Sequence, residues 1–500
     1  MITPLTRRAF LKSAGAMGLI AGAPAVFRAQ ASRPNILFIL CDEWRAQATG
    51  YAGDTNAQTP ALDRLAGESV NFVNACSNHP VCCPYRGSLI TGQFPLTHGL
   101  FLNDEELKPT GTTLGQAFAA AGYRTGWIGK WHMYGSPEGR YERRSAFIPP
   151  DHRFGFQYWK ANECTHDYNH SIYYEGDDPS PKYWQGYDAI AQTTDAFAFM
   201  EQQARTRDPF LLVLSMGPPH FPAHTAPERY EALYRDRDIR LRPNVPPESR
   251  EKAVNDLRGY YAHIAALDDC VARLLSTVDK AGIADNTIVV FTSDHGDMLG
   301  SQGRPMTTKH VGWDESIRIP FLLRYPKKLG KKGRKIQTVL GTPDIMPTLL
   351  SLADLKTPAG VQGTDYSKVA AGAAPPHESA ALLQFPVAYG ALRGAGWTEY
   401  RGVRTQRYTY IRTLKGQAYL YDNQADPYQL QNLIDRKESR PLQSRLDQTL
   451  NARLQAVNDD FLPGEEYIKR FGYEHNREIG PRASRGGGNA PRPTSSMIGA

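Results

Sequence analysis

The sequence predicts an α/β fold: a large, doubly wound mixed sheet flanked by helices, followed by a smaller C-terminal α+β domain. Short, continuous apolar runs alternate with longer segments of helical period, as in a sheet that is covered on both faces. Polar and charged residues cluster directly after the apolar runs, at the strand ends where open α/β sheets bind ligands. The chain has 500 residues, which suits one large domain with a smaller partner.

Four apolar runs are the predicted strands of the large sheet, and four periodic segments are the helices between them. The strands are expected near 36–40, 123–128, 209–215 and 287–292, and the helices near 60–66, 113–121, 189–203 and 253–281. Gly122 and Gly282 follow two of the helices as C-terminal stops. The aromatic stretch 134–187 is expected to be mostly loop. From about residue 376 the pattern changes to short β-like runs and a helix at 441–458.

The two ends of the chain predict a leader and a tail. The segment Thr6-Arg7-Arg8-Ala9-Phe10-Leu11-Lys12 resembles a twin-arginine export motif. The apolar run 14–26 that follows is too short and too rich in Gly and Ala for a stable membrane span. The expected division is a signal peptide at 1–31, the α/β domain at 32–375, the small domain at 376–473 and a disordered tail at 474–500. We therefore expect periplasmic or secreted protein, with the twin-arginine translocase as a partner.

Composition excludes some classes of protein. The chain is 41% hydrophobic and 22% charged, as in an ordinary globular protein, and its net charge of +7 is mild for its length. We therefore expect no nucleic-acid partner. The six cysteines have no zinc-finger spacing and are too sparse for a disulfide scaffold.

The segment Cys82-Cys83-Pro84-Tyr85-Arg86 carries the strongest chemical signal. Pro84 suits the first turn of a helix, because its missing N–H would lack a partner there. Cys82 would then lie at a helix N-terminus, where backbone N–H groups favour anions, and Arg86 could reach back toward the same point. Sulfur, helix N-terminus and arginine together indicate a site that handles an oxyanion. The alternative is a buried cysteine pair beside a helix start.

Acidic residues follow the first and fourth strands. Asp42 and Glu43 come after the first, and Asp294 and His295 come after the fourth. Hard oxygen ligands at one sheet edge indicate a divalent cation, most simply Ca²⁺. The alternatives are that Asp42 caps a helix and that Asp294 belongs only to a turn.

The Cys82-x-Pro84-x-Arg86 spacing, followed by Thr91-Gly92, resembles the sulfatase signature within the alkaline-phosphatase-like superfamily. Further motifs in family order carry the resemblance across about 33–432. They are Pro34-Asn35-Ile36 through Asp42, Gly129-Lys130-Trp131-His132, His220 after Pro218-Pro219, Asp294-His295-Gly296, Lys309, and Asp426-Pro427-Tyr428.

The resemblance implies how a sulfate ester would be hydrolysed. Cys82 would be oxidised to formylglycine by a formylglycine-generating enzyme, and its hydrate would be the nucleophile. The implied metal set is Asp42, Glu43, Cys82, Asp294 and His295, holding Ca²⁺ with Mn²⁺ or Mg²⁺ as alternatives.

The implied catalytic set adds side chains that handle charge and protons. Lys130 would neutralise the sulfate and Arg86 would hold the nucleophile, with Asp294 or Glu43 as its base. His220 and Lys309 would protonate the leaving group, and His132 would help to expel sulfate.

Two departures from the family pattern keep alternatives open. Glu43 stands where Asp is frequent and His295 where Asn is frequent, and an Asp-His pair also occurs in relatives that hydrolyse phosphonate monoesters and phosphodiesters. A third reading is a non-catalytic carbohydrate-binding relative in which Cys82 is never oxidised. The expected substrate is a sulfate ester of a small molecule or of a carbohydrate, and the sequence does not identify it further.

Overall fold

The structure is a computed structural model that describes residues 33–375, 379–389 and 397–476. The described residues from Pro34 onward belong to one compact unit. The predicted signal peptide lies outside the described residues, and so does the predicted tail from residue 477 onward. None of the helices in the described part combines the length and the apolar character that crossing a bilayer requires.

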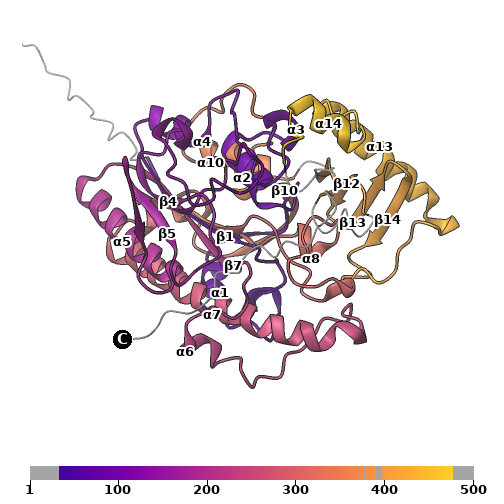
Figure 1. The fold of residues 1–500 in the computed structure, drawn as a ribbon, viewed down its shortest axis with the longest axis horizontal. Coiled ribbons are helices and arrows are strands. Elements are labelled where there is room, and N and C mark those ends of the chain that lie inside the picture. The colour runs from indigo at the N-terminus through magenta and orange to yellow at the C-terminus, as the bar shows by residue number, and fades with distance from the viewer. Residues whose placement is uncertain (1–32, 376–378, 390–396, 477–500) are drawn as a thin grey trace, which may run out of the picture. The chain divides into compact units, whose positions relative to one another are not determined.

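A ten-stranded mixed sheet is the centre of this unit (Figure 1). Its strand order is β10-β2-β9-β8-β1-β7-β3-β4-β5-β6. The strands are β1 Asn35–Asp42, β2 Val70–Cys76, β3 Arg124–Lys130, β4 Tyr158–Asn162, β5 Ile172–Glu175, β6 Asp178–Tyr183, β7 Phe210–Pro219, β8 Thr287–Ser293, β9 Phe321–Arg324 and β10 Arg334–Gly341. The central strands β8, β1, β7, β3 and β4 are parallel, whereas β9, β5 and β6 pair antiparallel with their neighbours.

Helices cover both faces of this sheet, because the buried central strands are apolar on both sides. In β1, Ile36, Phe38 and Leu40 point into one core and Leu37 and Ile39 into the other, as the two-residue period of a strand requires. The helices are α1 Pro60–Gly67, α2 Cys82–Thr91, α3 Pro95–His98, α4 Leu114–Ala120, α5 Asp188–Thr206, α6 Glu228–Glu231, α7 Arg250–Lys280, α8 Asp314–Ile317, α9 Pro326–Leu329, α10 Ile345–Leu352, α11 Ser367–Ala370, α13 Arg440–Ala456 and α14 Gly464–Phe471.

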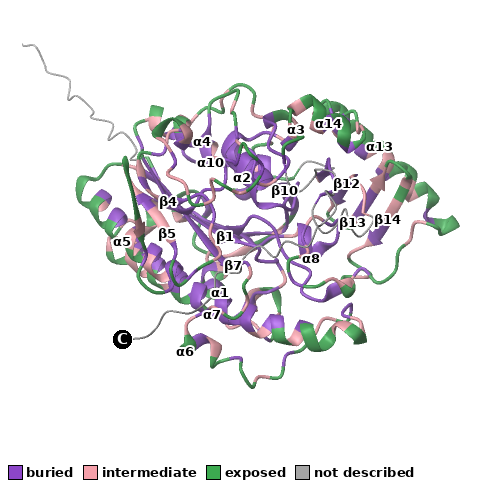
Figure 2. Cartoon of the chain, viewed as in Figure 1, coloured by how far each residue is buried: buried purple, intermediate pink, exposed green. Residues whose placement is uncertain are grey.

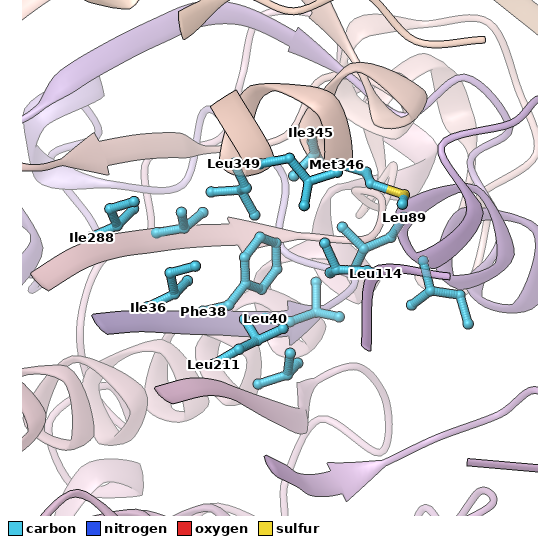
Figure 3. Close-up of a cluster of buried hydrophobic side chains, with 14 of the residues drawn as sticks. Ile36, Phe38, Leu40, Leu89, Leu114, Leu211, Ile288, Ile345, Met346 and Leu349 are labelled. Atoms are coloured by element: carbon cyan, nitrogen blue, oxygen red, sulfur yellow. The ribbon is translucent and has the colours of Figure 1, made fainter. Parts of the chain in front are cut away.

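The two cores use different helices. Figure 3 shows the first core, where Phe38 of β1 lies with Leu89 of α2, Leu114 of α4 and Met346 of α10. The second core packs α1, α5 and α7 against the opposite face. Helix α2 is buried along its whole length (Figure 2), so the segment that begins at Cys82 is held rigidly.

A separate four-stranded antiparallel sheet follows in the C-terminal part, with the order β11-β12-β13-β14. Its strands are β11 Ala380–Phe385, β12 Tyr400–Thr405, β13 Tyr408–Thr413 and β14 Gly416–Asp422. Helix α13 packs against it through Leu446, Leu450 and Leu454, and lies beside β12 in Figure 1. The predicted fold class is confirmed.

The structure differs from the sequence prediction in the stretch 134–187, which contains β4, β5 and β6 rather than mainly loop. Strand β6 is an exposed edge strand with two prolines, so it lacks the buried alternation by which strands are recognised. The predicted domain boundary at 375/376 adjoins residues outside the described ones and stays a prediction. Asn476, within the segment predicted to be a disordered tail, is buried and donates to Glu105.

Candidate active site

Cys82 is the first residue of α2, as predicted, and Val81 before it has extended backbone. The Cys82 side chain is buried. Its Sγ lies 3.2 Å from His295 Nε2, 3.6 Å from Asp42 Oδ1 and 3.5 Å from Lys309 Nζ. A sulfur atom at a helix N-terminus is thus surrounded by side chains from three other parts of the chain.

Asp42 and Asp294 come together because β1 and β8 are neighbouring parallel strands. Cys41 pairs with Ser293 in the register of these strands, so each acid directly follows, along its own strand, a residue of that pair. The buried Arg86 joins them: its Nη2 is 3.2 Å from Asp42 Oδ2 and 3.2 Å from Asp294 Oδ2. One Oδ atom of each carboxylate therefore accepts a hydrogen bond from the arginine.

The other carboxylate oxygens converge with two further ligands. Ligand atoms of Asp42, Cys82, Asp294 and His295 all lie within 4.8 Å of one another, and all four residues are buried. His295 Nδ1 is 3.0 Å from the Gly296 carbonyl, which favours the tautomer whose Nε2 lone pair faces the cluster. Two carboxylates and an imidazole nitrogen directed at one point suit a divalent cation.

Burial and mutual charge set the protonation of this cluster. Burial, and next the charge of Asp42, raise the pKa of Asp294 to about 6. Burial works against ionisation of Asp42 too, but Lys130, His220 and Arg86 hold the pKa of Asp42 well below its usual range. Burial would also raise the pKa of Cys82, yet Lys130, Lys309 and His295 bring it well below its ordinary value. The site therefore stabilises negative charge at residue 82.

Glu43 lies in a second group rather than with the four converging ligands. Its carboxylate is 3.1 Å from His220 Nε2 and 3.7 Å from Lys309 Nζ. Lys309 Nζ is also 2.9 Å from His220 Nε2. Burial, then the Lys309 charge, hold the pKa of His220 well below its usual value. Glu43 and His220, together with Asp42, also satisfy the geometry of a metal cluster.

Lys130 and His132 arise from the end of β3. Lys130 Nζ donates to Asp42 Oδ2 at 2.7 Å. His132 has a positive φ of 58°, which turns the chain sharply after the strand. Its Nε2 lies 3.6 Å from Asp104 Oδ1. Lys130 and His132, which are close together in the motif, therefore contact different carboxylates, those of Asp42 and Asp104.

All ten predicted site residues lie in these contacting groups, and five of them line a cavity of about 420 Å³: Cys82, Lys130, His132, His220 and Lys309. Sequence reasoning missed Asp104, Arg144 and Tyr389, which line the same cavity. It also missed Ser215, which accepts from Arg86 Nη1 at 2.8 Å. Only Ser215 carried a usable signal, because it ends a predicted strand at the sheet edge.

The fold and the placement of the site define the class of the protein. The structure resembles the phosphonate monoester hydrolase of Agrobacterium radiobacter with a TM-score of 0.67 and 21% identity, covering 85% of this chain and 96% of that one. It resembles yidJ of Bacteroides fragilis with a TM-score of 0.78 and 30% identity, covering 90% of this chain and 100% of that one. The fold is the alkaline-phosphatase-like fold.

Family comparison identifies the group within that class. The sulfatase family model matches residues 34–355, and the model for the C-terminal region of N-sulphoglucosamine sulphohydrolase matches 306–456. An ulvan-active sulfatase of Formosa agariphila is 44% identical over 88% of this chain and 85% of its own length. An endo-4-O-sulfatase of Bacteroides thetaiotaomicron is 30% identical over 90% of this chain and 97% of its own length. The chain belongs to the sulfatase family and is a sulfatase.

Proposed function

We propose that this sulfatase hydrolyses a sulfate ester of a carbohydrate, with formylglycine derived from Cys82 as the nucleophile and Ca²⁺ as the metal. The observation that carries the proposal is the convergence of Cys82 with Asp42, Asp294 and His295 within 4.8 Å. Mn²⁺ and Mg²⁺ are the alternative metals. Oxidation would replace the thiol by an aldehyde, whose hydrate offers a hydroxyl for attack on sulfur.

The residues that would hold the cation are Asp42, Asp294, His295 and residue 82. When bound, the cation would supply positive charge for the sulfate oxygens and for the attacking hydroxyl. Glu43 lies beside His220 and Lys309, so Asp294 is the better placed of the two carboxylates to act as base.

The side chains around residue 82 would divide the remaining work. Lys130 and Lys309 line the cavity and would bind the sulfate oxygens, which neutralises charge as the transition state forms. Arg86 would keep the two acids in place from behind. His220 and Lys309, in contact at 2.9 Å, would deliver a proton to the leaving sugar oxygen. His132 would take a proton as sulfate departs.

The relatives favour a carbohydrate substrate. One is named for activity on ulvan and another for endo-4-O-sulfatase activity, so ulvan is the first substrate to test. The test compares the kcat/KM of oxidised enzyme for sulfated sugars, aryl sulfates, phosphodiesters and phosphonates. Cys82→Ala should abolish turnover, and Cys83→Ala is the matched control that should retain it. A higher kcat/KM for a phosphodiester or phosphonate than for every sulfate ester would refute the proposal.

We also propose export by the twin-arginine translocase to the periplasm or beyond, with cysteine oxidation and metal loading completed before export. The support is the Thr6-Arg7-Arg8 motif, which lies outside the described residues. Replacing Arg7 and Arg8 by Lys should leave active enzyme in the cytoplasmic fraction. Unchanged export of that variant would contradict the proposal.

A further inference from the structure

The cavity in front of Cys82 has an outer wall that is separate from the residues around the sulfur atom. Its inner wall holds the residues around Cys82. The outer wall includes Tyr141, Arg144 and Phe221, which come from the chain between β3 and β4 and from the segment after β7. Aromatic rings beside hydrogen-bonding groups are a common lining for ligand sites.

The two lysines of the cavity are committed to the inner wall. Lys130 Nζ binds Asp42 at 2.7 Å, and Lys309 Nζ is 2.9 Å from His220 Nε2. The shortest contact of each ammonium group is therefore with a residue of the inner wall. A substrate group that reaches the outer wall would have to meet a different cation.

Arg144 is that cation. Its Nε and Nη2 donate to the Asp104 carboxylate at 2.8 and 2.7 Å, and its Cζ lies 3.9 Å from the centre of the Tyr141 ring. These contacts fix the plane of the guanidinium. Nη1 has no hydrogen-bond partner among the described residues, and 31% of the side chain is exposed.

The carboxylate that binds Arg144 is shared. Asp104 Oδ1 lies 3.6 Å from His132 Nε2 as well, and Asp104 is buried. The single negative charge of Asp104 is thus shared between two basic side chains, so it does not fully offset the positive charge of Arg144. Nη1 of Arg144 also remains available as a donor at the cavity.

We propose that Arg144 binds a second anionic group of the substrate, separate from the sulfate ester that is cleaved. This inference rests on the proposed function. The chemistry is that of a carboxylate or a second sulfate ester, because the planar donors of a guanidinium suit both kinds of oxyanion. The preferred substrate is therefore a polyanionic saccharide rather than a singly sulfated neutral one.

The test measures binding by calorimetry in a Cys82→Ala background, which binds without turnover. Three matched oligosaccharides share the same sulfate ester: one has a neighbouring uronic acid, one is its carboxyl-reduced form, and one has a second sulfate instead. Arg144→Gln should weaken binding of a dianionic ligand by about 10- to 100-fold, the range for a hydrogen bond to a charged group. Binding of the carboxyl-reduced ligand should change far less. Arg140→Gln is the control, since Arg140 is exposed on the same segment and does not line the cavity.

The two anion sources give different outcomes. A loss confined to the uronate ligand identifies a carboxylate, and a loss confined to the disulfated ligand identifies a second sulfate; either supports the subsite. An equal loss for all three ligands would mean that Arg144 only anchors Asp104, and no loss would mean that it contacts no ligand; either overturns it. If Cys82→Ala fails to fold, the ratio of kcat/KM values for the same ligands in the oxidised enzyme gives the same comparison. Absence of hydrolysis of any sulfate ester by the oxidised enzyme would instead refute the proposed function.

Discussion

Replacing His220 by Ala should slow substrates with poor leaving groups far more than those with good ones. His220 Nε2 lies 2.9 Å from Lys309 Nζ and 3.1 Å from Glu43 Oε2, and His220 lines the cavity. Removing the imidazole breaks the group that would supply the leaving oxygen's proton. General acid catalysis typically contributes about 10²–10⁴-fold, or about 3–5 kcal/mol of activation free energy, and this is the loss expected for a sugar sulfate.

The assay measures kcat/KM for a series of aryl sulfates with phenols of decreasing acidity, together with one sulfated sugar. The dependence of log kcat/KM on phenol pKa should become steeper in His220→Ala. His166→Ala is the matched control, because His166 stacks on His220 at 4.6 Å and lines the same cavity. Among the described residues, His166 forms no hydrogen bond or ion pair with Lys309 or Glu43. Arg86→Ala should slow all substrates by a similar factor, since it acts on the acid pair. An equal loss for all substrates in His220→Ala would show that His220 binds sulfate or shapes the cavity instead.

Two further predictions concern the metal and the stability at acid pH. The double variant Asp42→Ala, Asp294→Ala should lose its divalent cation together with its activity, and stoichiometric metal in that variant would place the site elsewhere. Burial opposes ionisation of Asp314, but Arg404 and Arg318 lower its pKa to about 2, below the value of about 3.9 expected in the unfolded chain. Asp314 therefore stabilises the fold by about 2–3 kcal/mol above pH 4, and this contribution is lost as the pH falls toward 2. Urea unfolding should show that the deficit of Asp314→Asn narrows over that range, with exposed Asp435→Asn as the control; a deficit independent of pH would contradict the ion-pair account.

The sequence predicted the part of the fold that is buried on both faces. The run from Ile36 to Leu40 is apolar throughout, and the acids after it mark its C-terminal end. Strand β2, in contrast, contains Asn71 and Asn74, and strand β9 has only four residues. Strand β2 pairs with β10 and β9, which are far away in sequence, and the short β9 lies between β2 and β8, so no local pattern reveals the place of either strand in the sheet.

The same limit applies to the site. Asp42, Cys82 and Asp294 could be predicted because Asp42 ends a strand, Asp294 directly follows one and Cys82 begins a helix. At such positions a local sequence pattern shows where the side chain lies in the fold. Asp104 and Arg144 lie in irregular segments forty residues apart, and only their contact in the folded chain shows that they belong to the site. Tyr389 reaches the cavity from the C-terminal part of the chain, and no spacing in the sequence connects it with Cys82.

The oxidation state of residue 82 in active enzyme decides whether formylglycine is the nucleophile. Cys82 and Cys83 differ in surroundings: Lys130, Lys309 and His295 surround Cys82, whereas burial raises the pKa of the Cys83 thiol to about 11. Peptide mass spectrometry, calibrated against the measured specific activity, would determine which residue is converted. We expect formylglycine at residue 82 in proportion to activity and an intact thiol at Cys83. Fully active enzyme with an unmodified Cys82 would contradict it.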